Sequence, residues 1–326
     1  MPDYTNLKGF SNIFDATVGN ELQDNIVEFM DWGLMEKGNY FNVTKGETGP
    51  NGYDYSLLQI SSSPHYTAGQ AWDGFRKNWI WQSGVSSSPS PIVGSSVNTP
   101  GISGVYVDDV FRPTSGVGTY AHSVDYFNGR VVFDSAIPTT STVQIEYSYR
   151  NVQTYIADQA PWWDELQYNS MRVDDSTFSQ VSSGNWAILA NNRVQMPAVI
   201  LEVVPRRTFR PYQIGDTSQF ITQDVLFHIV AESRWWRNQL VDIISYQKDK
   251  PLMLYDTDKV ASGNVFPLDY RGMVVSPTST YDAIVNDKNY QFTQCRITDM
   301  GVSEIQSFNT RLHEGTVRAS LEVILG

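Results

Sequence analysis

Residues 222–256 read TQDVLFHIVAESRWWRNQLVDIISYQKDKPLMLYD, and this stretch decides the fold. Val225, Phe227 and Ile229 alternate with other residues as in a strand that is covered on one face. Ser233 then offers a hydroxyl N-cap to a helix expected over 233–249. The apolar stripe of that helix consists of Trp236, Leu240, Ile243 and Ile244 and ends in Gln247. Pro251 ends the helix and Leu252 begins another strand, so the stretch predicts a core strand under an amphipathic helix.

The composition indicates a large core and extensive contact surfaces. Of the 326 residues, 41% are hydrophobic and 13% aromatic, whereas only 18% are charged. Tyr and Trp are favoured at interfaces, so the rings fit either subunit contacts or the core of a large β-protein. The net charge of −12 argues against general binding of nucleic acids, which relies on basic patches.

Sequence signals for disulfides, export and membrane insertion are absent. Cys295 is the single cysteine, so no internal disulfide and no cysteine-based metal cluster can form. We expect Cys295 to be packed within a strand. The first residues lack the basic and apolar regions of a secretory signal, and no apolar run is long enough to span a bilayer. These features predict synthesis in the cytosol and no membrane partner.

The remaining pattern predicts three parts and an α+β fold. A helix is expected over 20–37, and the Ser- and Pro-rich run 83–103 is typical of a linker. We therefore divide the chain into an N-terminal helix with an aromatic-rich irregular segment (1–100), an inserted antiparallel β-module (101–157) and an α+β core domain (158–326). In the module, Asn128-Gly129 predicts a two-residue hairpin turn. The core domain is expected to be an antiparallel sheet with helices packed on one face.

No catalytic or metal-binding motif emerges. The four histidines lie at least 57 residues apart, which excludes a local zinc motif. We expect His228 to be a hydrogen-bonded structural residue within its strand and His122 to lie on a strand surface. The acidic pairs Asp108-Asp109 and Asp174-Asp175 do not form the carboxylate pair of a glycosidase, because adjacent strand residues point to opposite faces. The sequence predicts a protein that is not an enzyme and holds no cofactor or metal.

A basic cluster follows the strand expected at 199–204. Arg206, Arg207 and Arg210 can grip an acidic partner, and on a chain this acidic a second copy is a natural candidate. A solvated loop is the alternative.

Three segments together resemble structural neck and tail-completion proteins of tailed bacteriophages. They are VILEVVPRR, the stretch 224–256 and the closing EGTVRASLEVIL, while the module from 105 to 152 resembles β-modules of phage virion proteins. The order of helices and strands is similar to that of tail terminators. The resemblance implies a six-membered ring that caps the tail and joins it to the head-side connector, next to neck and tail tube or sheath proteins. Genomic DNA would only pass through.

The resemblance also implies a site and a location. The polar face of the 233–249 helix, with Arg234, Arg237, Gln239 and Asp242, would contact a neighbouring subunit, and an edge strand would pair across the ring. The protein is then expected in the virion neck or tail, and in the host cytoplasm during assembly. The alternative is a carbohydrate-binding or host-adhesion protein, with a platform of exposed rings drawn from Trp79, Trp81, Trp162, Trp163, Trp235 and Trp236.

Overall fold

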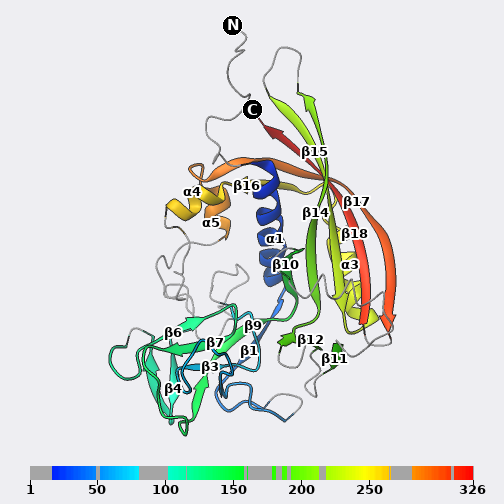
Figure 1. The fold of residues 1–326 in the computed structure, drawn as a ribbon. Coiled ribbons are helices and arrows are strands. Elements are labelled where there is room, and N and C mark those ends of the chain that lie inside the picture. Colours follow the sequence, from blue (N-terminus) through cyan, green and yellow to red (C-terminus); the bar gives the residue numbers. More distant parts are fainter. Residues whose placement is uncertain are drawn as a thin grey trace.

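The computed structural model describes residues 17–48, 52–80, 102–114, 116–157, 160, 178–180, 186–188, 192–212, 218–263, 265, 281–309 and 312–325, with backbone alone for 178–194 and 304–309. The protein is a mixed α+β structure in which sheets dominate, and its largest sheet curls like a half-barrel (Figure 1). The predicted linker 83–103 lies almost wholly outside the described residues. The pair Asp174-Asp175 and three of the six predicted platform tryptophans, Trp81, Trp162 and Trp163, also lie outside them.

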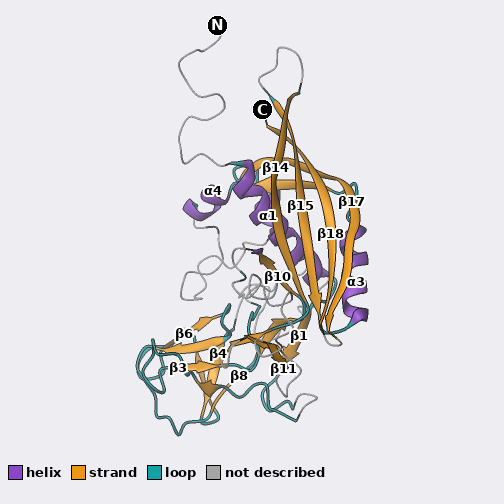
Figure 2. Ribbon diagram, turned by 45° about the vertical axis from the view of Figure 1, so that its right-hand side comes forward, coloured by secondary structure: helices purple, strands orange, loops and turns teal. Residues whose placement is uncertain are grey.

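The curled sheet has six strands in the order β10-β14-β15-β18-β17-β16. Their bounds are β10 Gln153–Ile156, β14 Ala198–Pro211, β15 Gln219–Ala231, β16 Pro251–Tyr255, β17 Gln291–Asn309 and β18 Leu312–Leu325. The pair β10–β14 is parallel and the other neighbours are antiparallel. Figure 2 shows the long strands side by side. The sequence predicted β14 to β18 in outline, whereas it assigned β10 to the inserted module.

Alternation along the strands builds one main core. Ile221, Val225 and Phe227 of β15 face the same cluster as Val317 and Ala319 of β18. The opposite face carries a smaller cluster that includes Ala198, Ile200 and Val230. The period-2 pattern that predicted the central strand therefore reflects its two differently covered faces.

Two helices pack on the main-core face of this sheet. They are α1 (Val18–Glu36) and α3 (Arg234–Ser245), and both contribute buried side chains to the main core. Asn25 of α1 also exchanges two hydrogen bonds with the backbone of Tyr255, at 2.8 and 2.9 Å. Two short helices, α4 (Thr257–Ser262) and α5 (Tyr281–Asn286), form a small cluster beside β16. Helices on one face of the sheet were predicted, although α3 ends four residues before the expected position.

The β-module is larger than the predicted 101–157. Its strands are β1 Tyr40–Val43, β2 Gln59–Ile60, β3 Ala71–Asp73, β4 Gly104–Val107, β5 Val110–Pro113, β6 His122–Asp125, β7 Arg130–Phe133, β8 Val143–Ile145 and β9 Tyr147–Arg150. Strands from before residue 81 pair with later ones, since β1 pairs with β9 and β3 with β7. Residues 40–80 therefore belong to this module and not to a separate N-terminal segment. Trp72 and Trp79 explain why, because both rings are buried in the module core.

The hairpin turns of the β-module differ from the one that the sequence predicted. Asp108 and Asp109 both have positive φ, at 51° and 66°, and form the two-residue turn between β4 and β5. Asn128-Gly129 does lie in a hairpin, but Asp125 pairs with Arg130, so residues 126–129 form a four-residue loop. Only Gly129 of that pair has positive φ, and the Asp125 carboxylate accepts from the Asn128 N–H instead. The two-residue turn predicted at Asn128-Gly129 is therefore wrong.

A buried ion pair joins the β-module to the rest of the chain. The Arg150 guanidinium donates to both carboxylate oxygens of Asp31 in α1, with Nε–Oδ1 at 2.7 Å and Nη2–Oδ2 at 2.8 Å. Asn39 hydrogen-bonds both the N–H and the carbonyl of Val152. Entry and exit of the module are thus fixed against each other. A further small sheet consists of β11 Phe178–Gln180, β12 Trp186–Ile188 and β13 Asn192–Val194.

Candidate interaction site

Among the described residues, one long edge of the curled sheet has no strand partner over much of its length, and we call it a free edge. The short strand β10 pairs with β14 only from Ala198 to Leu201. Beyond Leu201, β14 pairs with β15 on its inner side, and the described part of the chain supplies no partner on the outer side. Figure 1 shows this end of the β14–β15 hairpin extending past α1. An unpaired strand edge is a template for pairing with another chain.

The basic cluster lies on this edge, but its three arginines are not equally exposed. Arg206 and Arg210 are exposed, and Phe209 and Tyr212 beside them are exposed to 58% and 47%. Arg207 is half-buried instead. Its Nε donates to Oε1 of Gln223 at 2.7 Å, and burial lowers the pKa of its guanidinium. Gly19 of α1 lies under this side chain, since a Cβ there would be 2.8 Å from Arg207 Nη2. Arg207 therefore braces α1, and only Arg206 and Arg210 are displayed to a partner.

The second predicted contact surface lies on α3, and three of its four residues are exposed. Arg234, Gln239 and Asp242 are exposed as expected. Arg237 is buried, and its guanidinium donates to Oδ1 of Asn238. Arg237 therefore does not lie on the exposed face of α3, where the sequence placed it.

Gly315 of β18 accounts for the burial of Arg237. A Cβ at this glycine would lie 2.8 Å from Val241 Cγ2 and 3.3 Å from Arg237 Cγ. The missing side chain therefore admits the apolar stem of Arg237 into the buried stripe of α3, beside Leu240, Val241 and Ile244. Because that stripe is rotated from the predicted one, Ile243 and Trp236 are only partly buried.

A second free edge lies on the opposite flank of the sheet. Strand β16 pairs with β17 only as far as Arg296. From Thr298 to Asn309, β17 has β18 as its one strand partner within the described ranges. Three irregularities interrupt this part of the ladder, and Val302 is 48% exposed. Bulges are a common feature of natural sheet edges.

The two free edges are diagonal to each other. The free part of β14 lies beside the first half of β15, which pairs with the last residues of β18 and so lies at the β16 end. The free part of β17 lies at the other end, where β10 covers β14. Each flank of the sheet is therefore covered by a short strand at one end and open at the other.

The histidine predictions are confirmed in one case and wrong in another. His228 is buried, with Nε2 3.0 Å from Glu202 Oε2 and Nδ1 3.2 Å from Glu314 Oε1. Burial opposes the charged imidazole, but the two carboxylates outweigh it and raise the pKa of His228. This is the structural histidine that the sequence predicted. His122, expected on a strand surface, is buried and contacts the Tyr120 carbonyl, and burial lowers its pKa.

A small pocket lies where the β-module meets the curled sheet. It has a volume of about 200 Å³ and is lined by Arg76 and Tyr149 of the module and by Glu232 and Trp236 near α3. Oε1 of Glu232 is buried without a hydrogen-bond partner among the described residues. Burial raises the pKa of this carboxyl to about 7, although the charge of Arg76 opposes the rise. We call this the junction pocket.

Comparison with known proteins identifies no relative, and the described residues show no metal-binding group. No protein-family model matches the sequence, and no curated protein is detectably similar to it. Within the described ranges, no group of three or more His, Cys, Asp or Glu side chains is arranged to hold a metal ion. The helices of the described residues are too short or too polar to cross a bilayer. Cys295 is buried, as predicted.

Proposed function

We propose that this chain is a structural subunit that assembles with copies of itself into a ring, as a neck or tail-terminator protein of a tailed bacteriophage. The observation that carries the proposal is the pair of diagonal free edges on one curled sheet. Two different edges on opposite flanks favour head-to-tail pairing, in which β14 of one copy adds to β17 of the next. Such contacts close into a ring when the rotation from one copy to the next is a whole-number fraction of a full turn.

Charge supports this pairing of unlike edges. The β14 edge displays Arg206 and Arg210, whereas β17 carries Asp299, whose side chain is 74% exposed and lies 3.5 Å from Nζ of Lys248 in the same chain. Pro205 lacks an N–H and lies next to a bulge in the ladder, so new backbone pairing would begin after it. The exposed rings of Phe209 and Tyr212 then add apolar area at the contact.

The proposed location in the virion, at the neck or tail end, rests on the resemblance described above. In this proposal the ring, taken as a hexamer, caps the tail, contacts neck and tail tube or sheath proteins, and lets genomic DNA pass. The net charge of −12 would keep DNA from adhering to the passage. A positively charged lumen in an assembled ring would contradict that part.

Light scattering of the purified chain tests the assembly. We expect a discrete ring, or a monomer that assembles on purified tail tubes, across a dilution series. The double variant Arg206→Glu/Arg210→Glu should weaken association about tenfold or more, roughly 1.4 kcal/mol, because it places like charges on both edges. The control Lys37→Glu/Lys288→Glu makes the same charge change at exposed positions away from both edges.

Two outcomes would reject the proposal. The first is a chain that stays monomeric at every concentration and ignores tail tubes. The second is a ring that forms equally well with the edge variant and the control.

A further inference from the structure

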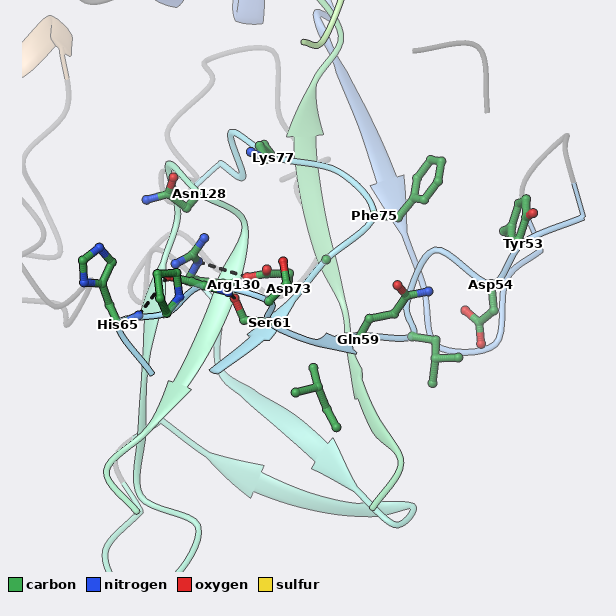
Figure 3. Close-up of a pocket in the computed structure, with 16 residues that line it drawn as sticks. Tyr53, Asp54, Gln59, Ser61, His65, Asp73, Phe75, Lys77, Asn128 and Arg130 are labelled. Carbon is green, nitrogen blue, oxygen red and sulfur yellow. Dashed lines mark hydrogen bonds and ion pairs between the residues drawn. The ribbon is translucent and has the colours of Figure 1, made fainter. Parts of the chain in front are cut away.

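A groove of about 640 Å³ runs across the β-module, outside the edges discussed above. Its walls are strand β2, the loop that follows to His65, and the segment from Asp73 to Lys77, with Asn128 and Arg130 opposite (Figure 3). The volume is within the range of small-molecule sites. We call it the β2 groove.

One end of the β2 groove is aromatic and rigid. The Tyr53 and Phe75 rings stack with centroids 6.1 Å apart, and Phe75 stacks in turn on Tyr55 at 4.6 Å. Arg76 lies 5.2 Å from the centre of the Phe75 ring. Tyr53, at the open end of this stack, is 52% exposed. A flat ring thus faces solvent in a position that its neighbours fix.

The remainder of the groove is mainly polar, with Leu57, Ile60 and Pro64 as its apolar members, and its formal charges balance. Its lining includes neutral hydrogen-bonding side chains, namely Gln59, Ser61, Ser62, Ser63 and Asn128. Figure 3 shows Gln59, Ser61 and Asp73 between the aromatic end and His65 at the far end. Asp73 pairs with Arg130, with Oδ1–Nε at 3.1 Å. Asp54 accepts from the backbone N–H and the hydroxyl of Ser56.

This chemistry selects among ligand classes. The formal charges of Asp54, Asp73, Lys77 and Arg130 cancel, so the lining does not favour a strongly charged ligand. An extended peptide would need a strand edge, but β2 has only two residues. Sugar hydroxyls both donate and accept, which matches amides and hydroxyls, and the C–H face of a pyranose packs on the electron-rich face of an aromatic ring.

We infer that the β2 groove binds a neutral oligosaccharide, with one sugar ring on Tyr53 and the next residues along Gln59, Ser61 and the Asp73–Arg130 pair. The inference does not depend on the proposed ring. It also replaces the platform expected from the sequence, because Trp79 is fully buried and Trp236 half-buried. Trp235 is exposed but lies on α3, and Trp81, Trp162 and Trp163 lie outside the described residues.

A glycan array probed with the full-length chain tests the inference. The array carries neutral oligomers (glucans, galactans and N-acetylhexosamine chains) beside acidic ones (uronate, sialylated and sulfated chains). We expect binding among the neutral oligomers, followed by saturable binding of the best neutral hexasaccharide in calorimetry. Tyr53→Ala and Gln59→Ala should each weaken that binding about tenfold or more.

The matched control is Phe127→Ala, which removes another exposed ring of the module, 62% exposed and not part of the groove lining. It should bind as the unchanged chain does, and melting curves should show that all three variants remain folded. An array without neutral hits, binding to acidic chains alone, or binding that survives Tyr53→Ala would overturn the inference.

Discussion

The curled sheet and the β-module reach a stable core by different means. In the sheet, strands such as β15 (Gln219–Ala231) form long ladders over a core that is mostly aliphatic. Among the described strands of the module none exceeds four residues, and the largest fully buried side chains there are Trp79, Tyr147 and Phe133. Short strands provide few ladder hydrogen bonds, so the module relies more on its rings.

The rings of the module supply polar anchors as well as apolar area. Nε1 of Trp79 donates to the Arg76 carbonyl at 2.8 Å, and the Tyr147 hydroxyl donates to the Tyr55 carbonyl at 3.0 Å. Burial raises the pKa of Tyr147, so its hydroxyl stays protonated and remains a donor. The aromatic content that the sequence assigned either to interfaces or to a core serves, in this region, the core. Buried Trp and Tyr commonly find such partners.

The largest effects are expected from truncating one core at a time. Trp79→Ala should cost about 4–5 kcal/mol in the module, since it opens a cavity and removes a hydrogen bond. Phe227→Ala should cost about 3–4 kcal/mol in the curled sheet, where it is 2% exposed. Scanning calorimetry should show two transitions, each variant lowering a different one. A single transition that both variants lower equally would mean that the two regions unfold as one.

A smaller loss is expected at the link between the regions. Arg150→Ala should cost about 3 kcal/mol, because it leaves the buried Asp31 carboxylate without its cation. Arg296→Ala is the control, since its pair with Asp249 is about 60% exposed on both sides and should be worth less than about 1 kcal/mol. Denaturant unfolding measures both. Equal losses would show that the Asp31–Arg150 pair does not couple the regions.

The smallest effect concerns the junction pocket and depends on pH. The pKa of Glu232 is raised from 4.5 to about 7 in the folded chain, so proton binding favours the folded state at low pH. That advantage is lost as the pH rises from about 4.5 to 7. Glu232→Gln carries no charge, and we expect it to melt roughly 2–4 °C above the unchanged chain at pH 8. At pH 4 the difference should nearly vanish, and an equal difference at both pH values would refute the assignment.

Sequence patterns sufficed where the determining residues lie close together. The alternation of Val225, Phe227 and Ile229 identified β15, and the spacing of Leu22, Ile26 and Met30 identified α1. Fold class followed from such local periods. The phage assignment and the ring remain predictions.

What the sequence missed depends on partners far along the chain. The sequence predicted an exposed Arg237 because the space that its stem fills depends on Gly315, which lies far along the chain in β18. The sequence predicted Trp79 as a platform residue because its packing partner is distant in the chain. The ring centroids of Trp79 and Tyr147 are 4.5 Å apart, although Tyr147 follows 68 residues later (147 − 79). The free edges and the β2 groove likewise arise from strand order and register, which no local pattern specifies.

The pairing of β1 with β9 has a consequence for how such a molecule can change over time. Tyr40 lies opposite Arg150, so the chain leaves the sheet region and returns to it at almost the same point. A segment inserted in this way imposes little strain on its host, since a few residues could close the gap between α1 and β10. Substitutions within the module can therefore reshape the β2 groove, the inferred sugar site, while the edges of the curled sheet stay as they are.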